Sequence, residues 1–303
     1  MENDKWDKLL EAINEEPIIS TRKGLHWVLY DDNIGAHSSL RRAQKQAEEQ
    51  GGFVASLPQL LRERVLNPYT VHTVEGESES YRGLDMVDKI WIPNLTGLSE
   101  EDVGKTRRGS DVLVEVHGGG IVLSSPERME RAYETNPRAT SVDISDLEVY
   151  DLLDGRLPDG TEIPIFPFNE FRQGIRDLPA RYGVVMDLDM AKKSLYGGWE
   201  IQSFHNDPLM IVRAGGVEEA IAYMELARNN YDDFDNYHHL KDLDPNKPQG
   251  KWLSVDGIED NLNSAGLLSN HVLGASAHFV AVYNPRGTLE NKFQNSLIIA
   301  IFK

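Results

Sequence analysis

The order of helical and extended segments along the 303-residue chain most constrains its fold. Runs rich in β-branched and aromatic residues predict strands at residues 25–30, 53–55, 89–93, 111–116, 183–188, 209–213 and 278–283. Apolar residues at helical spacing predict helices at residues 4–15, 38–50, 56–66, 126–134, 146–153 and 218–229. The two kinds do not alternate as in a βαβ repeat. We therefore expect an α+β fold with a mixed, largely antiparallel sheet packed with several short helices.

Proline is concentrated between residues 155 and 179, where four prolines mark a candidate boundary between two lobes. The sequence predicts an N-terminal α+β lobe over residues 1–155 and a C-terminal α+β lobe over residues 180–303. A single domain with a proline-stiffened excursion fits the same pattern, and both alternatives stay open.

Composition narrows the class of protein. The absence of cysteine excludes disulfides, thiolate metal sites and cysteine nucleophiles. With 49 acidic and 31 basic residues the net charge is −18, which disfavours nucleic acid and anionic membranes as partners. The N-terminus is polar and no apolar run approaches the roughly 20 residues of a membrane span, which favours a cytoplasmic location. The expected partner is a protein or a small molecule.

The strand at 111–116 runs directly into His117 and three glycines, Gly118–Gly120. This HGGG sequence resembles the oxyanion-hole loop of esterases in the α/β-hydrolase family. The resemblance implies a strand-to-loop site with His117 as a candidate catalytic residue. The sequence departs from the family's pattern at the nucleophile elbow, G-x-S-x-G. Its nearest counterpart, residues 262–266, begins with leucine instead of glycine. The alternative is a hairpin that turns at Gly118–Gly119 into a strand over residues 121–123.

A second pattern places Asp187 and Asp189 at the end of the strand over residues 183–188. It resembles the first motif of haloacid-dehalogenase-type phosphatases and the metal-binding D-x-D of nucleotide-sugar glycosyltransferases. The resemblance implies that the two carboxylates hold Mg²⁺ or Mn²⁺, with His205 and Asp207 as further ligands or a general base. Alternatively, Asp189 caps a helix that starts at Met190, and residues 206–208 form a turn between two strands.

Two classes of function follow. The first is a binding or interaction protein with no identifiable catalytic constellation and no cofactor. The second is a divalent-metal-dependent hydrolase or transferase acting on a phosphorylated or sugar substrate. In that class Asp187 and Asp189 are metal ligands, and His205 or Asp207 is the next ligand or base.

Overall fold

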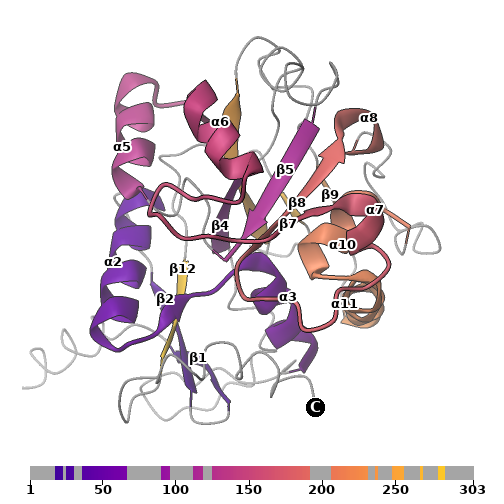
Figure 1. Cartoon of the computed structure of the whole chain (residues 1–303). Helices are drawn as coiled ribbons and strands as arrows, with labels where there is room; N and C mark the ends of the chain where they lie inside the picture. Colours follow the sequence, from indigo (N-terminus) through magenta and orange to yellow (C-terminus); the bar gives the residue numbers. More distant parts are fainter. Residues whose placement is uncertain are drawn as a thin grey trace, which may run out of the picture.

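The computed structural model describes part of the chain, and every structural statement below concerns that part. It comprises residues 18–22, 25–30, 36–66, 90–95, 112–118, 125–191, 206–230, 236–237, 248–255, 267–268 and 279–283. The predicted helix at 4–15 lies outside these residues. Figure 1 shows the arrangement of the helices and strands.

One sheet brings the two ends of the described chain together. Its order is β1-β2-β12-β3, and all its pairs are antiparallel. The strands are β1 (Ile18–Arg22), β2 (Leu25–Tyr30), β3 (Phe53–Val54) and β12 (Phe279–Tyr283). Ala281 of β12 lies opposite Val28 on one side and Val54 on the other. The C-terminal strand is thus inserted between strands from the first 60 residues.

A second sheet has β10 (Gln249–Val255) in contact with three other strands. β4 (Ile90–Leu95), β6 (Val142–Asp143) and β11 (Leu267–Leu268) all pair antiparallel with it. β9 (Asn236–Tyr237) pairs parallel with β11. The polar sequence of residues 231–249 predicts a long loop, but β9 forms within it. Pro93 lies in β4, which pairs with β10 alone among the described strands, so the missing N–H of proline is tolerated.

The third sheet is short, and most of β5 and β8 is buried. β8 (Tyr182–Asp187) pairs antiparallel with β5 (Val112–His117) and parallel with β7 (Ile165–Pro167). Residues 182–186 of β8 are all buried, which explains why the strand has a continuous apolar sequence. The mixed and mostly antiparallel pairing of the three sheets confirms the predicted α+β class.

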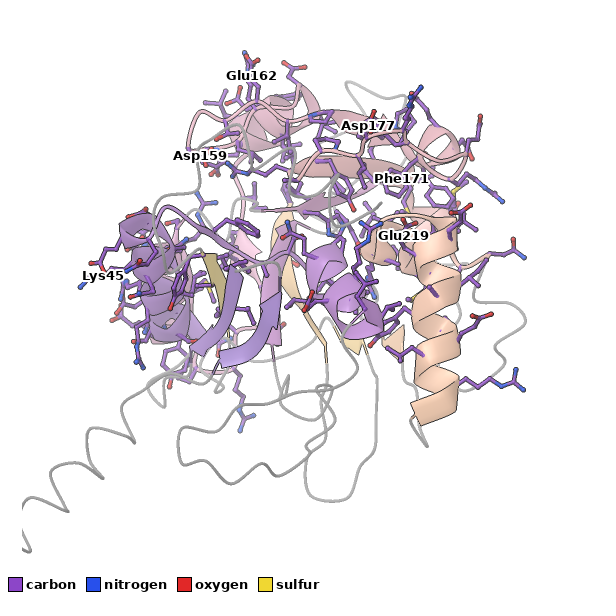
Figure 2. The ribbon with its side chains drawn as sticks, turned by 90° about the horizontal axis from the view of Figure 1, so that it is seen from below. Lys45, Asp159, Glu162, Phe171, Asp177 and Glu219 are labelled. Atoms are coloured by element: carbon purple, nitrogen blue, oxygen red, sulfur yellow. The ribbon has the colours of Figure 1, made fainter. Side chains whose placement is uncertain are left out.

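Eight helices pack around these sheets. They are α2 (Ala36–Glu49), α3 (Leu57–Leu66), α5 (Pro126–Thr135), α6 (Asp146–Leu153), α7 (Phe168–Phe171), α8 (Leu188–Ala191), α10 (Pro208–Ala214) and α11 (Val217–Asn230) among the described residues. α2 and α5 lie side by side, while α3, α10 and α11 form a second group (Figure 1). Lys45 lies on the outer face of α2, far from Glu219 of α11 (Figure 2). None of the described helices is long and apolar enough to cross a bilayer.

The segment 208–214 corrects an expectation. Its β-branched, apolar sequence predicts a strand, but it is the helix α10. Asp207 caps the helix by accepting the N–H groups of Leu209 and Met210, both at 3.0 Å, and Pro208 occupies the first turn. All seven residues of α10 are buried. A helix buried on every side has no polar face, so the helical period is absent from its sequence.

The largest core cluster joins residues from Ala55 to Val282. α3, α10 and α11 contribute most of its helical side, and Leu113, Val184 and Met186 contribute its sheet side. A second cluster lies between α2, α5 and β12. Strand pairs β2–β12 and β4–β10 connect the ranges 1–155 and 180–303. The division into two lobes stays a prediction.

Candidate functional site

His117, the candidate catalytic residue of the HGGG pattern, lies at the end of β5 and is fully buried. Its ring stacks on that of Tyr182, with 5.0 Å between the ring centroids. Gly118 follows with φ of +80°, and a Cβ there would lie 2.3 Å from the carbonyl oxygen of Ala180. Glycine is therefore required at 118 by the close approach of the backbone. Gly119, Gly120 and the predicted hairpin strand lie outside the described residues.

A buried ion pair adjoins His117. Arg213 of α10 donates from Nε (3.2 Å) and Nη2 (3.1 Å) to Oε1 of Glu115 on β5. Neither residue is more than 1 % exposed. The second carboxylate oxygen, Oε2, lies 3.7 Å from Nε2 of His117 and has no hydrogen-bond partner within the described structure. This pair ties α10 to the β5–β8 sheet.

Protonation in this cluster follows from burial and charge together. Burial raises the pKa of Glu115, but Arg213 and His117 outweigh it and hold the pKa below its usual value. Burial lowers the pKa of His117, more than Glu115 raises it, so the imidazole is neutral near pH 7. Burial also raises the pKa of Tyr182 well above its usual value. The cluster thus has one negative and one positive charge, and both are paired.

The predicted metal ligands are spread over different environments. Asp187 ends β8 with an exposed side chain, and Asp189 is exposed in the first turn of α8. Since α8 begins at Leu188, Asp189 is inside the helix and is not the cap of a helix that starts at Met190. Asp207 is buried as the cap of α10, and His205 lies outside the described residues. No group of three His, Asp or Glu side chains suited to a metal occurs among the described residues. The Mg²⁺ or Mn²⁺ site stays a prediction.

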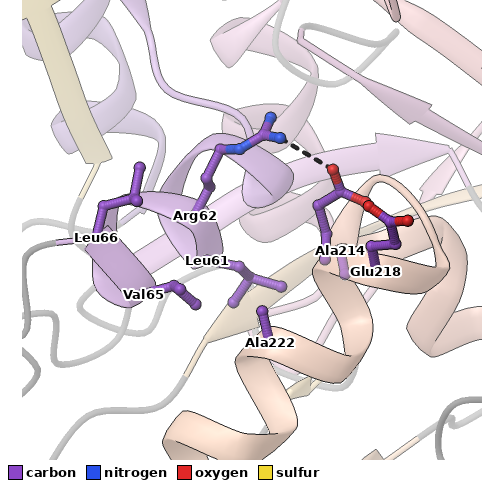
Figure 3. Close-up of a pocket in the computed structure, with 8 residues that line it drawn as sticks. Leu61, Arg62, Val65, Leu66, Ala214, Glu218 and Ala222 are labelled. Carbon is purple, nitrogen blue, oxygen red and sulfur yellow. Dashed lines mark hydrogen bonds and ion pairs between the residues drawn. The ribbon is translucent and has the colours of Figure 1, made fainter. Parts of the chain in front are cut away.

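A small hollow of about 220 Å³ lies between α3 and α11 (Figure 3). Its walls are mainly apolar, formed by Leu61, Val65, Leu66, Ala214 and Ala222. An ion pair of 2.9 Å between Arg62 Nη2 and Glu219 Oε1 lies beside it. Burial lowers the pKa of Arg62 to about 10, against the opposite effect of Glu219. The charged groups of Arg62 and Glu219 at the hollow are already paired with each other.

A larger hollow of about 530 Å³ lies where α5 turns into β6. We call it the arginine hollow, because three arginines line it among otherwise neutral residues and one aspartate. Its lining residues are Arg128, Arg131, Ala132, Thr135, Asn136, Arg138, Ala139, Thr140, Ser141, Val142, Asp143 and Gln249. The volume is within the range of about 300–1,000 Å³ that is usual for small-molecule sites.

The walls of the arginine hollow are fixed by local structure. Arg128, Arg131 and Thr135 share one face of α5, because they are three and four residues apart. The opposite face of α5 packs Met129 into the second core cluster. After the helix, the side chain of Asn136 accepts the N–H of Arg138 at 3.0 Å and fixes the turn. β6 then pairs with β10, with Gln249 opposite Asp143, and provides another wall.

The three arginines differ in their partners. Arg128 Nη2 donates to Oε1 of Glu148, and Arg128 Nη1 is buried with no hydrogen-bond partner in the described region. Arg131 and Arg138 are exposed, and no ion pair to a described carboxylate exists for either. Glu127 and Glu130 of the same helix pair with Arg41 of α2 instead. The hollow is therefore a positively charged surface on a chain with net charge −18.

Sequence reasoning did not identify this hollow. These arginines are three and seven positions apart along residues 128–138 and form no basic cluster in the sequence. A helical projection of α5 shows Arg128 and Arg131 on one face. No sequence pattern relates that face to Gln249, because their contact depends on the pairing of β6 with β10.

Comparison with known proteins shows the fold. No protein-family model and no curated protein matches the chain. One solved structure is described as showing the accommodation of massive sequence variation in Nanoarchaeota by the C-type lectin fold. It aligns with a TM-score of 0.58 at 21% sequence identity, over 87% of this chain and 100% of that one. The three sheets and eight described helices of this chain thus form a C-type lectin-like fold.

Proposed function

We propose that this protein is a binding protein without chemistry of its own and that the arginine hollow is its ligand site. One observation carries the proposal. The hollow combines a volume of about 530 Å³ with two exposed guanidinium groups, on Arg131 and Arg138, that pair with no described carboxylate. Unpaired cations on an acidic surface are groups that a ligand can engage without breaking an existing interaction.

The fold supports this proposal from a different direction. In the similar structure, the C-type lectin fold accommodates massive sequence variation. A scaffold of that kind separates the residues that stabilise the fold from those that are free to change. In this chain Met129 and Val142, next to the hollow, belong to a buried cluster, whereas Arg131, Arg138 and Ser141 do not. The hollow therefore lies on a stable base, as a binding surface requires.

The test fills the hollow without regard to ligand chemistry. We would probe an immobilised array of sugars, organic acids and peptides with labelled wild-type protein and with a Ser141→Trp variant. Gln173→Trp is the matched control, because Gln173 is exposed after α7 and lines neither hollow. Capture by the wild type and the control but not by Ser141→Trp is the expected result. Equal capture by all three proteins, or no capture by the wild type, contradicts the proposal.

A further inference from the structure

We infer that the ligand of the arginine hollow is a small, polyhydroxylated acid bound through its carboxylate, sulfate or phosphate group. The inference rests on the proposed function and adds the chemical class of the ligand. It has three parts, which are the charge of the hollow, the geometry of its arginines and the chemistry of its neutral wall.

The charge of the hollow selects an anion. Three arginines and one aspartate, Asp143, are its ionisable residues, and because Glu148 neutralises Arg128, a formal charge of +1 remains. Glu148, the carboxylate nearest to Arg128, is occupied by that arginine and by Ser145. An oxyanion at the hollow gains attraction from each guanidinium, and the attraction is strongest where the ligand displaces water.

One of the three arginines is held by an ion pair, and the other two are exposed. Arg128 is held by Glu148, and its side chain is 24 % exposed. Arg131 and Arg138 enter from the helix and from the turn that follows it. A guanidinium donates two parallel N–H groups, which match the two oxygens of a carboxylate, sulfate or phosphate. Two such groups from different segments can clamp one oxyanion.

The neutral wall selects hydroxyl groups. Hydroxyls and amides line most of the remaining surface, on Thr135, Asn136, Thr140, Ser141 and Gln249. Hydroxyl and amide groups both donate and accept hydrogen bonds, as the hydroxyls of a sugar do. Ala132, Ala139 and Val142 add an apolar part that is similar in extent to the polar part. An oxyanion on a polyhydroxylated body matches the guanidinium, hydroxyl and amide groups of the hollow better than an aliphatic or aromatic acid does.

The net charge of −18 argues for a small ligand. A polyanion such as a nucleic acid extends beyond the hollow and over the surrounding acidic surface, where it is repelled. A ligand with one or two charges fits within the hollow. Its distance from the guanidinium groups is then shorter than the Debye length of about 10 Å in 0.1 M salt, so salt screens their attraction only in part.

The experiment separates charge from shape. We would measure binding of glucuronate, glucose 6-sulfate, glucose 6-phosphate and glucose by isothermal titration calorimetry, with inorganic sulfate as a further probe. The proteins are the wild type, Arg131→Gln/Arg138→Gln and the control Arg172→Gln/Arg176→Gln, which makes the same charge change beside α7, away from α5 (Figure 1). The three acids distinguish which oxyanion is preferred.

We expect at least one acid to bind about tenfold or more tightly than glucose, with weaker binding at higher salt. Arg131→Gln/Arg138→Gln should lose about tenfold or more of that affinity, and the control should lose none. Equal binding of glucose, retention of affinity in the Arg131/Arg138 variant, or no binding of any acid overturns the inference. If Ser141→Trp still blocks capture of a neutral ligand, the proposed function stands and only the ligand class fails. If Ser141→Trp has no effect on capture, the proposed function itself fails.

Discussion

Replacement of Arg213 by methionine tests whether α10 is attached to the β5–β8 sheet by charge. Both nitrogens of Arg213 that contact Glu115 donate to Oε1, and both side chains are buried. After Arg213→Met, the Glu115 carboxylate stays in the core, with His117 as its neighbour at 3.7 Å. Removal of one partner of a buried ion pair costs about 3–5 kcal/mol. We expect the free energy of unfolding at pH 7 to fall by that amount.

A double variant isolates the charge from the volume of the side chain. Glu115→Leu/Arg213→Met removes both charges and leaves no unpaired carboxylate at this position, so it should recover most of the loss and lie within about 2 kcal/mol of the wild type. The assay is urea denaturation followed by circular dichroism, with Glu115→Leu alone as the third corner of the cycle. If the loss in the double variant equals the sum of the losses in Arg213→Met and Glu115→Leu, the ion pair contributes no coupling and the reasoning fails.

Three further predictions follow from single sites. Gly118→Ala should destabilise more than Gly160→Ala in urea denaturation, because both glycines have positive φ but only a Cβ at 118 meets backbone, 2.3 Å away; equal losses of about 1 kcal/mol would show that strain alone acts. Burial lowers the pKa of His117, so as the pH falls the unfolded chain takes up the proton before the folded chain does, and the free energy of unfolding should decrease below about pH 6.5. His117→Phe should weaken this pH dependence. An unchanged slope of the free energy of unfolding against pH, from pH 7 to 5, would contradict the prediction. The metal hypothesis predicts that Mg²⁺ or Mn²⁺ raises the melting temperature saturably, with a stabilisation of about 2–3 kcal/mol at 100-fold excess over Kd. Asp187→Asn/Asp189→Asn should abolish this stabilisation. Identical stabilisation of both proteins would refute the hypothesis.

Local chemistry made much of the fold predictable. A serine followed three residues later by glutamine or glutamate predicts a helix start at Ser56 and at Ser145. At the start of α3 the Ser56 N–H donates to Gln59 Oε1 at 2.8 Å, and at the start of α6 Ser145 and Glu148 form a complete capping box. Each signal involves residues three positions apart, so it acts in the isolated segment before any tertiary contact forms. The strands β2, β5, β8 and β12 are also predictable from local sequence, because they are rich in β-branched and aromatic residues.

Tertiary contacts decide what local chemistry left unresolved. The sequence of α10 has the composition of a strand, but the cap at Asp207 and complete burial make it a helix. The partnership of Arg213 with Glu115 spans 98 positions in sequence, so no motif contains both residues. The arginine hollow likewise requires β6 to pair with β10, which brings Gln249 beside Asp143. Both features depend on pairing of distant segments, and one sequence alone does not reveal it.

The contacts of Arg128 distinguish it from the two exposed arginines of the hollow. Glu148 holds Arg128 through Oε1 and accepts both the N–H and the hydroxyl of Ser145 through Oε2, so the fixed arginine is tied to the cap of α6. Substitution of Arg128 therefore disturbs two helices, whereas Arg131 and Arg138 are exposed and pair with no described carboxylate. Changes at these two positions alter the charge presented to a ligand at little cost in stability, since exposed positions away from buried networks tolerate substitution. Arg128 is thus attached to the fold, whereas Arg131 and Arg138 are exposed at the surface of the hollow.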